Sequence, residues 1–177
     1  MMVKKAVKQI LRCILAPVRW AYRSRNGVIA AEERNELPND AFLSLVSEKI
    51  RQGYSAIIWV KGYSMRPFLE YGRDKVKLVP PVRLEVGDAV LAQVTPGHYV
   101  LHRIIEMQGE QIVLQGDGNV EGVERCRRSD VCGVVAAYIR PRRTILAGSP
   151  TLKRNVRIWR RLRPVRRFLL FLYKLYI

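Results

Sequence analysis

The sequence predicts a mainly β protein, built as an antiparallel sheet or small barrel with amphipathic helices at its flanks. Short runs rich in β-branched and aromatic residues follow one another from residue 56 onward, separated by turn-forming Gly, Pro, Asn and Asp residues. No helical stretch lies between these runs, which favours antiparallel pairing over alternating strands and helices. The expected strands are 56–60, 75–79, 89–94, 99–106, 111–115 and 131–139.

Length and composition agree with one folded domain at 38–146, which begins with a helix at 40–52. The chain has 177 residues, and 49% of them are apolar, which is enough for one core and excludes wholesale disorder. Asn39 or Asp40 is the expected N-cap of the leading helix, and Gly53 is its expected stop. Three cysteines are too few for a disulfide scaffold or for a zinc site built from cysteine alone.

The strong positive charge, formally +17, is concentrated at the two ends of the chain. Residues 1–25 contain seven basic residues and residues 139–177 contain twelve, with no acid in either segment. The intervening residues hold thirteen basic and all fifteen acidic residues, so the middle of the chain is nearly neutral. A fold that binds nucleic acid would spread basic residues over its body, and no nucleic-acid partner is therefore expected.

Both basic ends, 1–25 and 151–177, are also amphipathic. Pro164 is expected to kink the C-terminal helix or to begin a second one. The residues expected to share its apolar face are Ile158, Leu162, Val165, Leu169, Leu172 and Tyr176. Neither end contains the roughly 20 apolar residues that span a bilayer, and no secretory signal peptide or transmembrane anchor is expected.

Basic residues beside Trp, Phe and Leu are typical of helices that lie in an anionic membrane interface. The ends therefore predict peripheral association with a membrane, and the charge bias favours its cytoplasmic face. The alternative is that both helices pack on the core and only present a basic face to solvent.

Three short segments of the predicted sheet contain side chains that suit acyl-transfer chemistry. Ser64 follows a strand in the segment 62–67, where its hydroxyl and its backbone N–H can face a substrate carbonyl. His102 lies in a strand among apolar neighbours and is one of only two histidines, which narrows the choice of a base. Asp117 lies in the turn 116–119. Each segment alone is also consistent with a structural role, as a turn former, a strand histidine and a hairpin turn.

No metal or cofactor is expected. His98 and His102 are four residues apart, a spacing that would let them share a zinc ion on a helix. In a strand the same spacing separates them by about 13 Å, which is too far for one metal ion.

Taken in order, these segments resemble the signal-peptidase superfamily, whose fold the LexA-type repressors share. The resemblance covers about 56–139 and depends on Gly-x-Ser-Met-x-Pro at 62–67, Leu-His-Arg-Ile-Ile at 101–105 and Gly-Asp-Gly-Asn at 116–119. The pattern is similar to the branch found in archaea, the endoplasmic reticulum and spore-forming bacteria, where a histidine replaces the lysine base. No lysine lies between Lys77 and Lys153, which argues against the Ser-Lys form.

The resemblance implies a role for each residue that matches the family pattern. Ser64 matches the nucleophile and His102 the general base. Met65 matches the residue after the nucleophile, where it packs and sets the turn, and Gly62 supports the same turn without adding a side-chain donor. Asp117 matches the aspartate that supports the active site.

The chain departs from the family at its expected second aspartate. That residue is absent, and the segment Gly-Asp-Asn-Asn of the family is Gly-Asp-Gly-Asn in this chain. The third catalytic carboxylate is therefore Asp117, Glu121 or Glu124.

The expected function is that of a serine endopeptidase of signal-peptidase type. It would hydrolyse a peptide bond in a leader or signal sequence through an acyl-enzyme, with a peptide or preprotein as its partner. One alternative is a catalytically inactive module on the same fold that binds peptides or membranes. A nucleic-acid-binding protein, suggested by charge alone, is the less favoured alternative.

Overall fold

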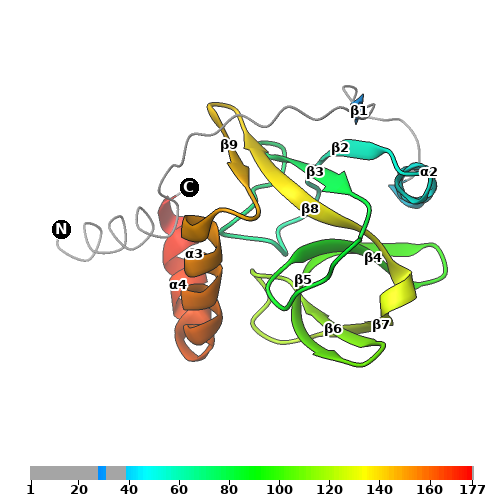
Figure 1. The fold of residues 1–177 in the computed structure, drawn as a ribbon. Coiled ribbons are helices and arrows are strands. Elements are labelled where there is room, and N and C mark those ends of the chain that lie inside the picture. Colours follow the sequence, from blue (N-terminus) through cyan, green and yellow to red (C-terminus); the bar gives the residue numbers. More distant parts are fainter. Residues whose placement is uncertain (1–27, 31–38, 177) are drawn as a thin grey trace.

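The computed structural model describes residues 28–30 and 39–176, which form a mainly β structure with helices at its edges (Figure 1). The predicted antiparallel sheet with flanking helices is confirmed, whereas the basic segment 1–25 lies outside the described residues. The strands are β1 (Val28–Ala30), β2 (Ser55–Trp59), β3 (Lys75–Val79), β4 (Ala89–Thr95), β5 (His98–Gln108), β6 (Gln111–Gln115), β7 (Glu124–Arg127), β8 (Val131–Arg140) and β9 (Arg143–Leu146). The helices are α2 (Asn39–Arg51), α3 (Pro150–Arg161) and α4 (Arg166–Tyr176), with 3-10 turns η1 (Arg128–Asp130) and η2 (Arg163–Val165).

The described strands belong to one sheet with the order β1-β2-β3-β8-β4-β5-β6-β7, and β9 pairs with β8. β1 runs parallel to β2, and all the other pairs are antiparallel. β8 lies between β3 and β4, so these two consecutive strands do not pair with each other. The sheet is not closed into a barrel; Figure 1 shows β2, β3, β8 and β9 on one side and the curved strands β4 to β7 on the other.

Two groups of buried apolar side chains form the core. The first core cluster lies where α2 and the C-terminal helices meet the sheet, and it includes Ile50, Val76 and Trp159. The second core cluster lies within the curved half, between β4, β5 and β6, and includes Ile104 and Leu114. Successive residues of β4 alternate between the two clusters, because neighbouring side chains of a strand point to opposite faces.

The C-terminal hairpin, residues 150–176, consists of α3 and α4 separated by η2, which contains Pro164. Of the two expectations for Pro164, a kink or the start of a second helix, the structure agrees with the second: α4 begins at Arg166, directly after the 3-10 turn that contains Pro164. The hairpin is buried through Leu152, Val156 and Trp159 of α3 and through Leu170 and Tyr173 of α4.

The single apolar face that the sequence predicts for this region is wrong. Ile158 is 40% exposed and Val165 is 48% exposed, although both were expected on that face. The interruption at η2 changes the register between the two helices, so a helical repeat counted across Pro164 does not describe one surface.

The hairpin also exposes an apolar stripe along α4, on the side away from its buried residues Leu170 and Tyr173. Phe168, Phe171 and Leu175 are 60%, 57% and 69% exposed, and their spacing of three and four residues aligns them on one helix face. Within residues 28–30 and 39–176, no helix is long and apolar enough to cross a membrane.

Candidate active site

Ser64 lies in the loop between β2 and β3, which is held in place by its own apolar side chains. Met65 is 2% exposed, and Phe68 and Leu69 are fully buried in the first core cluster. The N–H groups of Phe68 and Leu69 both donate to the Met65 carbonyl oxygen at 3.0 Å, which makes the loop a tight turn. Met65 is therefore a packing residue, as expected. Gly62 is exposed and has a φ of +76°, a conformation that residues with a side chain rarely adopt.

The turn 116–119 contacts the backbone of the serine loop directly. The Gly118 N–H donates to the Ser64 carbonyl oxygen at 2.6 Å. A Cβ atom at Gly116 would lie 2.5 Å from the same Ser64 oxygen, and one at Gly118 would lie 2.7 Å from the Tyr63 carbonyl oxygen. Both positions therefore require glycine, because no side chain fits between two backbones that approach so closely.

His102 is held by a carboxylate from the neighbouring part of the sheet. It lies on β5 opposite Val90, is 6% exposed, and has its Nδ1 atom 2.8 Å from Oε2 of Glu124, the first residue of β7. In the neutral imidazole this contact assigns the proton to Nδ1, which then donates to the carboxylate. Nε2 is left with a lone pair and can accept a proton.

Asp117 has a different partner, the arginine that follows His102 on β5. Arg103 Nε donates to both carboxylate oxygens of Asp117 at 2.8 and 3.0 Å, and its Nη1 donates to the Gly87 carbonyl oxygen at 2.7 Å. Both side chains are almost completely buried. Burial works against the charged guanidinium, but Asp117 and Tyr138 together outweigh it through attraction and hydrogen bonding, so the pKa of Arg103 is raised.

The carboxylate beside His102 is therefore Glu124 and not Asp117, whose oxygens are engaged by Arg103. Successive residues of a strand point to opposite faces, so an aspartate that binds Arg103 is directed away from the His102 imidazole. Glu121, the remaining alternative, is exposed to solvent.

Ser64 opens onto a groove whose far wall belongs to the C-terminal hairpin. The groove has a volume of about 540 Å³, and α4 contributes Arg167, Leu170, Phe171 and Lys174 to it. Its serine side includes Tyr63, Arg66, Gly118, Asn119 and Val120. The groove is thus apolar and positively charged along α4.

Charge in the groove is balanced only on its serine side. Arg66 makes a bidentate ion pair with Glu70, with Nε 3.0 Å from both carboxylate oxygens, and this hydrogen bonding raises the pKa of Arg66. In the described part of the chain, neither Arg167 nor Lys174 forms an ion pair. A substrate with a negative charge would therefore be favoured near α4.

The hairpin is bound to the active-site turn by polar contacts as well as by apolar packing. Trp159 Nε1 donates to the Asp117 carbonyl oxygen at 2.9 Å, and Arg166 Nη1 donates to the Asn119 carbonyl oxygen at 3.1 Å. Arg166 is 3% exposed, and burial lowers its pKa. The C-terminal helices therefore pack on the core, as one of the two alternatives for this segment expects, and they also determine the shape of the groove.

The structure joins the predicted residues in pairs and not in one chain of hydrogen bonds. Ser64 contacts the turn 116–119, His102 contacts Glu124, and Asp117 contacts Arg103. Ser64 Oγ makes no hydrogen bond to His102 or to any other described residue.

The sequence motifs assign no function to Arg103. In the structure, Arg103 binds Asp117 and thereby holds the turn 116–119 against the serine loop. A charged residue between His102 and Ile104, in the middle of an apolar strand, is the signal that identifies such a buried ion pair. Trp159 and Arg166 have no comparable signal, because their partners are about 40 to 50 residues away in the sequence and include the backbone oxygens of Asp117 and Asn119.

The described residues contain no cluster of three or more His, Cys, Asp or Glu side chains that would hold a metal ion. Cys126 and Cys132 are free and buried, and burial raises the pKa of the Cys126 thiol to about 11.

No known protein family, curated protein sequence or solved structure matches the chain. The resemblance to signal peptidases therefore depends on the ordered motifs alone.

The buried ion pair predicts a structural effect for Asp117. Asp117→Asn removes the charge that compensates Arg103, so the free energy of unfolding should fall by about 3 kcal/mol. Urea denaturation followed by circular dichroism measures this change. Glu121→Gln removes an exposed carboxylate close by and should change stability by less than about 0.5 kcal/mol. Equal urea midpoints for the two variants would contradict this role of the ion pair.

Proposed function

We propose that the protein is a serine endopeptidase of signal-peptidase type, which cleaves a leader or signal sequence through an acyl-enzyme at a membrane surface. The observation that carries the proposal is the His102–Glu124 pair at 2.8 Å, because it leaves Nε2 of a buried imidazole able to accept a proton. A half-buried serine at the edge of a groove supplies the matching nucleophile.

Each side chain then has a defined chemical role. His102 Nε2 removes the proton from Ser64 Oγ as the hydroxyl attacks the substrate carbonyl, and Glu124 stabilises the imidazolium that forms. The imidazolium gives the proton to the leaving amine, and a water molecule activated by the same imidazole hydrolyses the acyl-enzyme.

The backbone N–H of Ser64 is suited to stabilise the oxyanion. Among the described residues it donates to no acceptor, and the neighbouring turn 116–119 keeps the loop from relaxing. A donor of this kind contributes roughly 3–4 kcal/mol to transition-state stabilisation in comparable enzymes.

The part of the β2 edge that no described strand pairs with offers a place for an extended peptide. β1 pairs only with residues 55–57 of β2, so the described strands leave the same edge unpaired from Ile58 toward the serine loop. A substrate that adds as a strand along this edge would be led to Ser64 in line with β1.

The apolar stripe on α4 supports peripheral membrane attachment. Phe168, Phe171 and Leu175 are exposed, and the hairpin has basic residues and no acidic ones. Burial of the stripe in the lipid interface, together with attraction to anionic headgroups, would place the groove beside the membrane.

A non-catalytic peptide-binding module is the second candidate, because Ser64 Oγ makes no hydrogen bond to His102. In unliganded enzymes such contacts are often long and tighten when substrate binds, so the two candidates differ in reactivity and not in fold.

Reactivity of Ser64 separates these candidates. A fluorophosphonate probe should label the wild-type protein, and Ser64→Ala or His102→Ala should slow labelling by about a thousandfold or more. Ser44→Ala and His98→Ala are matched controls at exposed positions and should be labelled at the wild-type rate. A folded wild-type protein that resists the probe would favour the binding module, and unchanged labelling of Ser64→Ala would exclude the proposed nucleophile.

The negative charge of Glu124 should affect the rate of Ser64 labelling more than the stability of the fold. Glu124→Gln keeps the size of the side chain but removes the negative charge that stabilises the imidazolium, and labelling should slow by roughly 10²- to 10⁴-fold. Glu121→Gln is the matched control and should react at the wild-type rate. If Asp117 oriented the imidazole instead, Glu124→Gln would react as fast as its control.

Membrane binding should depend on the apolar stripe. Phe168→Ser with Leu175→Ser removes two exposed apolar side chains without changing the net charge. Sedimentation with phosphatidylglycerol vesicles should show at least a roughly tenfold loss of binding, because each side chain contributes up to about 1.5–3 kcal/mol when buried. The control Leu45→Ser with Val82→Ser removes exposed apolar side chains elsewhere and should bind normally. Equal binding of the two double variants would mean that the stripe does not enter the membrane.

A further inference from the structure

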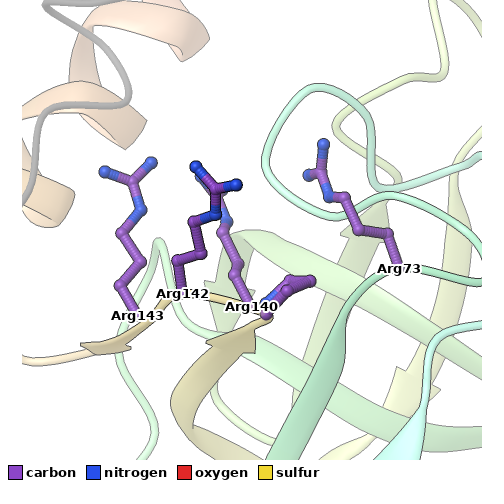
Figure 2. A pocket seen from close by; sticks show the side chains of 5 residues that line it. Arg73, Arg140, Arg142 and Arg143 are labelled. Carbon is purple, nitrogen blue, oxygen red and sulfur yellow. The ribbon is translucent and has the colours of Figure 1, made fainter.

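A second pocket, separate from the serine groove, is lined almost entirely by arginine. It has a volume of about 440 Å³ and is formed by Arg73, Arg140, Pro141, Arg142 and Arg143, which we call the arginine pocket. Figure 2 shows Arg142 and Arg143 projecting in the same direction from the turn between β8 and β9, with Arg73 across the pocket from them.

The backbone brings these side chains together from two distant segments. Arg140 ends β8 and pairs with Arg143 of β9, so a two-residue connection holds three arginines next to one another. Arg73 lies just before β3 and forms the opposite wall of the pocket. Arg140 itself is held in place, because its side chain is only 10% exposed and its Nη2 donates to the Phe68 carbonyl oxygen at 2.7 Å.

The positive charge of the pocket is only partly compensated. Asp74 is the only carboxylate that these arginines contact within the described residues, at 2.8 Å from Arg73 Nη2 and 3.9 Å from Arg140 Nε. Arg142 and Arg143 form no ion pair in the described part of the chain.

Arg140 is the residue most affected by this imbalance. Burial is the main cause that lowers its pKa, and the nearby charges of Arg143 and Arg73 lower it further against the attraction of Asp74. Its Nε atom is buried without a hydrogen-bond partner among the described residues. An anion in the pocket would relieve this repulsion.

We propose that the arginine pocket binds a phosphate group. Guanidinium groups are planar donors that pair with phosphate oxygens in two parallel hydrogen bonds, and several of them converge here on one volume. A phosphate that carries one to two negative charges would balance the uncompensated arginines. This site is independent of the proposed peptidase activity.

The arginine pocket lies close to the C-terminal hairpin, for which membrane attachment is proposed above. The Tyr173 hydroxyl of α4 donates to Glu70 Oε2 at 3.2 Å, and the Glu70 carbonyl oxygen accepts from the Arg73 N–H at 3.4 Å, so α4 contacts the loop that holds Arg73. The phosphate is therefore either the headgroup of a membrane phospholipid or a soluble phosphate, and both sources have the same recognition chemistry.

The test uses the full chain and two variants with the same change in charge. Arg142→Gln with Arg143→Gln alters the pocket, whereas Arg125→Gln with Arg128→Gln alters exposed residues of β7 and η1. Calorimetric titration with inorganic phosphate at constant ionic strength tests the soluble source. Sedimentation with phosphatidylcholine vesicles, with and without phosphatidic acid, tests the headgroup.

In at least one of the two arms, the pocket variant should lose about tenfold more affinity for phosphate or for the vesicles than the control, because it alone loses hydrogen bonds to the phosphate. The general attraction to an anionic surface falls equally in both variants. A specific loss in the vesicle arm alone identifies a lipid headgroup, and one in the titration alone identifies a soluble phosphate. Equal losses in the two variants, or no phosphate-dependent binding in either arm, would overturn the proposal.

Discussion

The buried ion pair between Arg103 and Asp117 is the interaction on which the rest of the candidate site depends. The ion pair fixes the turn 116–119 against β5. The Gly118 N–H of this turn donates a hydrogen bond to the Ser64 carbonyl oxygen. The Asp117 carbonyl oxygen also receives Trp159 of α3, so the same residue connects the sheet, the serine loop and the C-terminal hairpin. The buried Arg103 guanidinium needs the Asp117 carboxylate as its counter-charge, so the first role of Asp117 is structural.

The C-terminal hairpin packs on the core and still leaves an apolar stripe exposed, so core packing does not remove the surface for which membrane attachment is proposed. One side of α4 packs on the core through Leu170 and Tyr173, while Phe168 and Leu175 remain exposed on the other. Because α4 also forms a wall of the serine groove, any surface that binds the exposed stripe lies beside that groove. In the proposed function, membrane attachment and access of the substrate to Ser64 would both depend on this eleven-residue helix.

The candidate site was predictable where its residues lie in ordered local motifs. Ser64, Met65 and His102 are candidates because their motifs follow one another in a fixed order, and the structure adds the contact between the serine loop and the turn 116–119. Glu124 is different, because β7 is a short strand with the sequence Glu-Arg-Cys-Arg and has no apolar alternation to indicate a strand. Only its pairing with β6 brings Glu124 to His102.

The sequence by itself determined the fold class, six of the strands and the division of charge, because alternation, turn residues and composition are local properties. Tertiary structure decided the strand order, in which β8 separates β3 from β4, and the addition of β1, β7 and β9. Tertiary structure also decided which carboxylate lies within hydrogen-bond distance of His102 and which arginine pairs with Asp117. These choices depend on contacts between residues far apart in the chain, where the burial of charge selects the partner and local pattern contains no information.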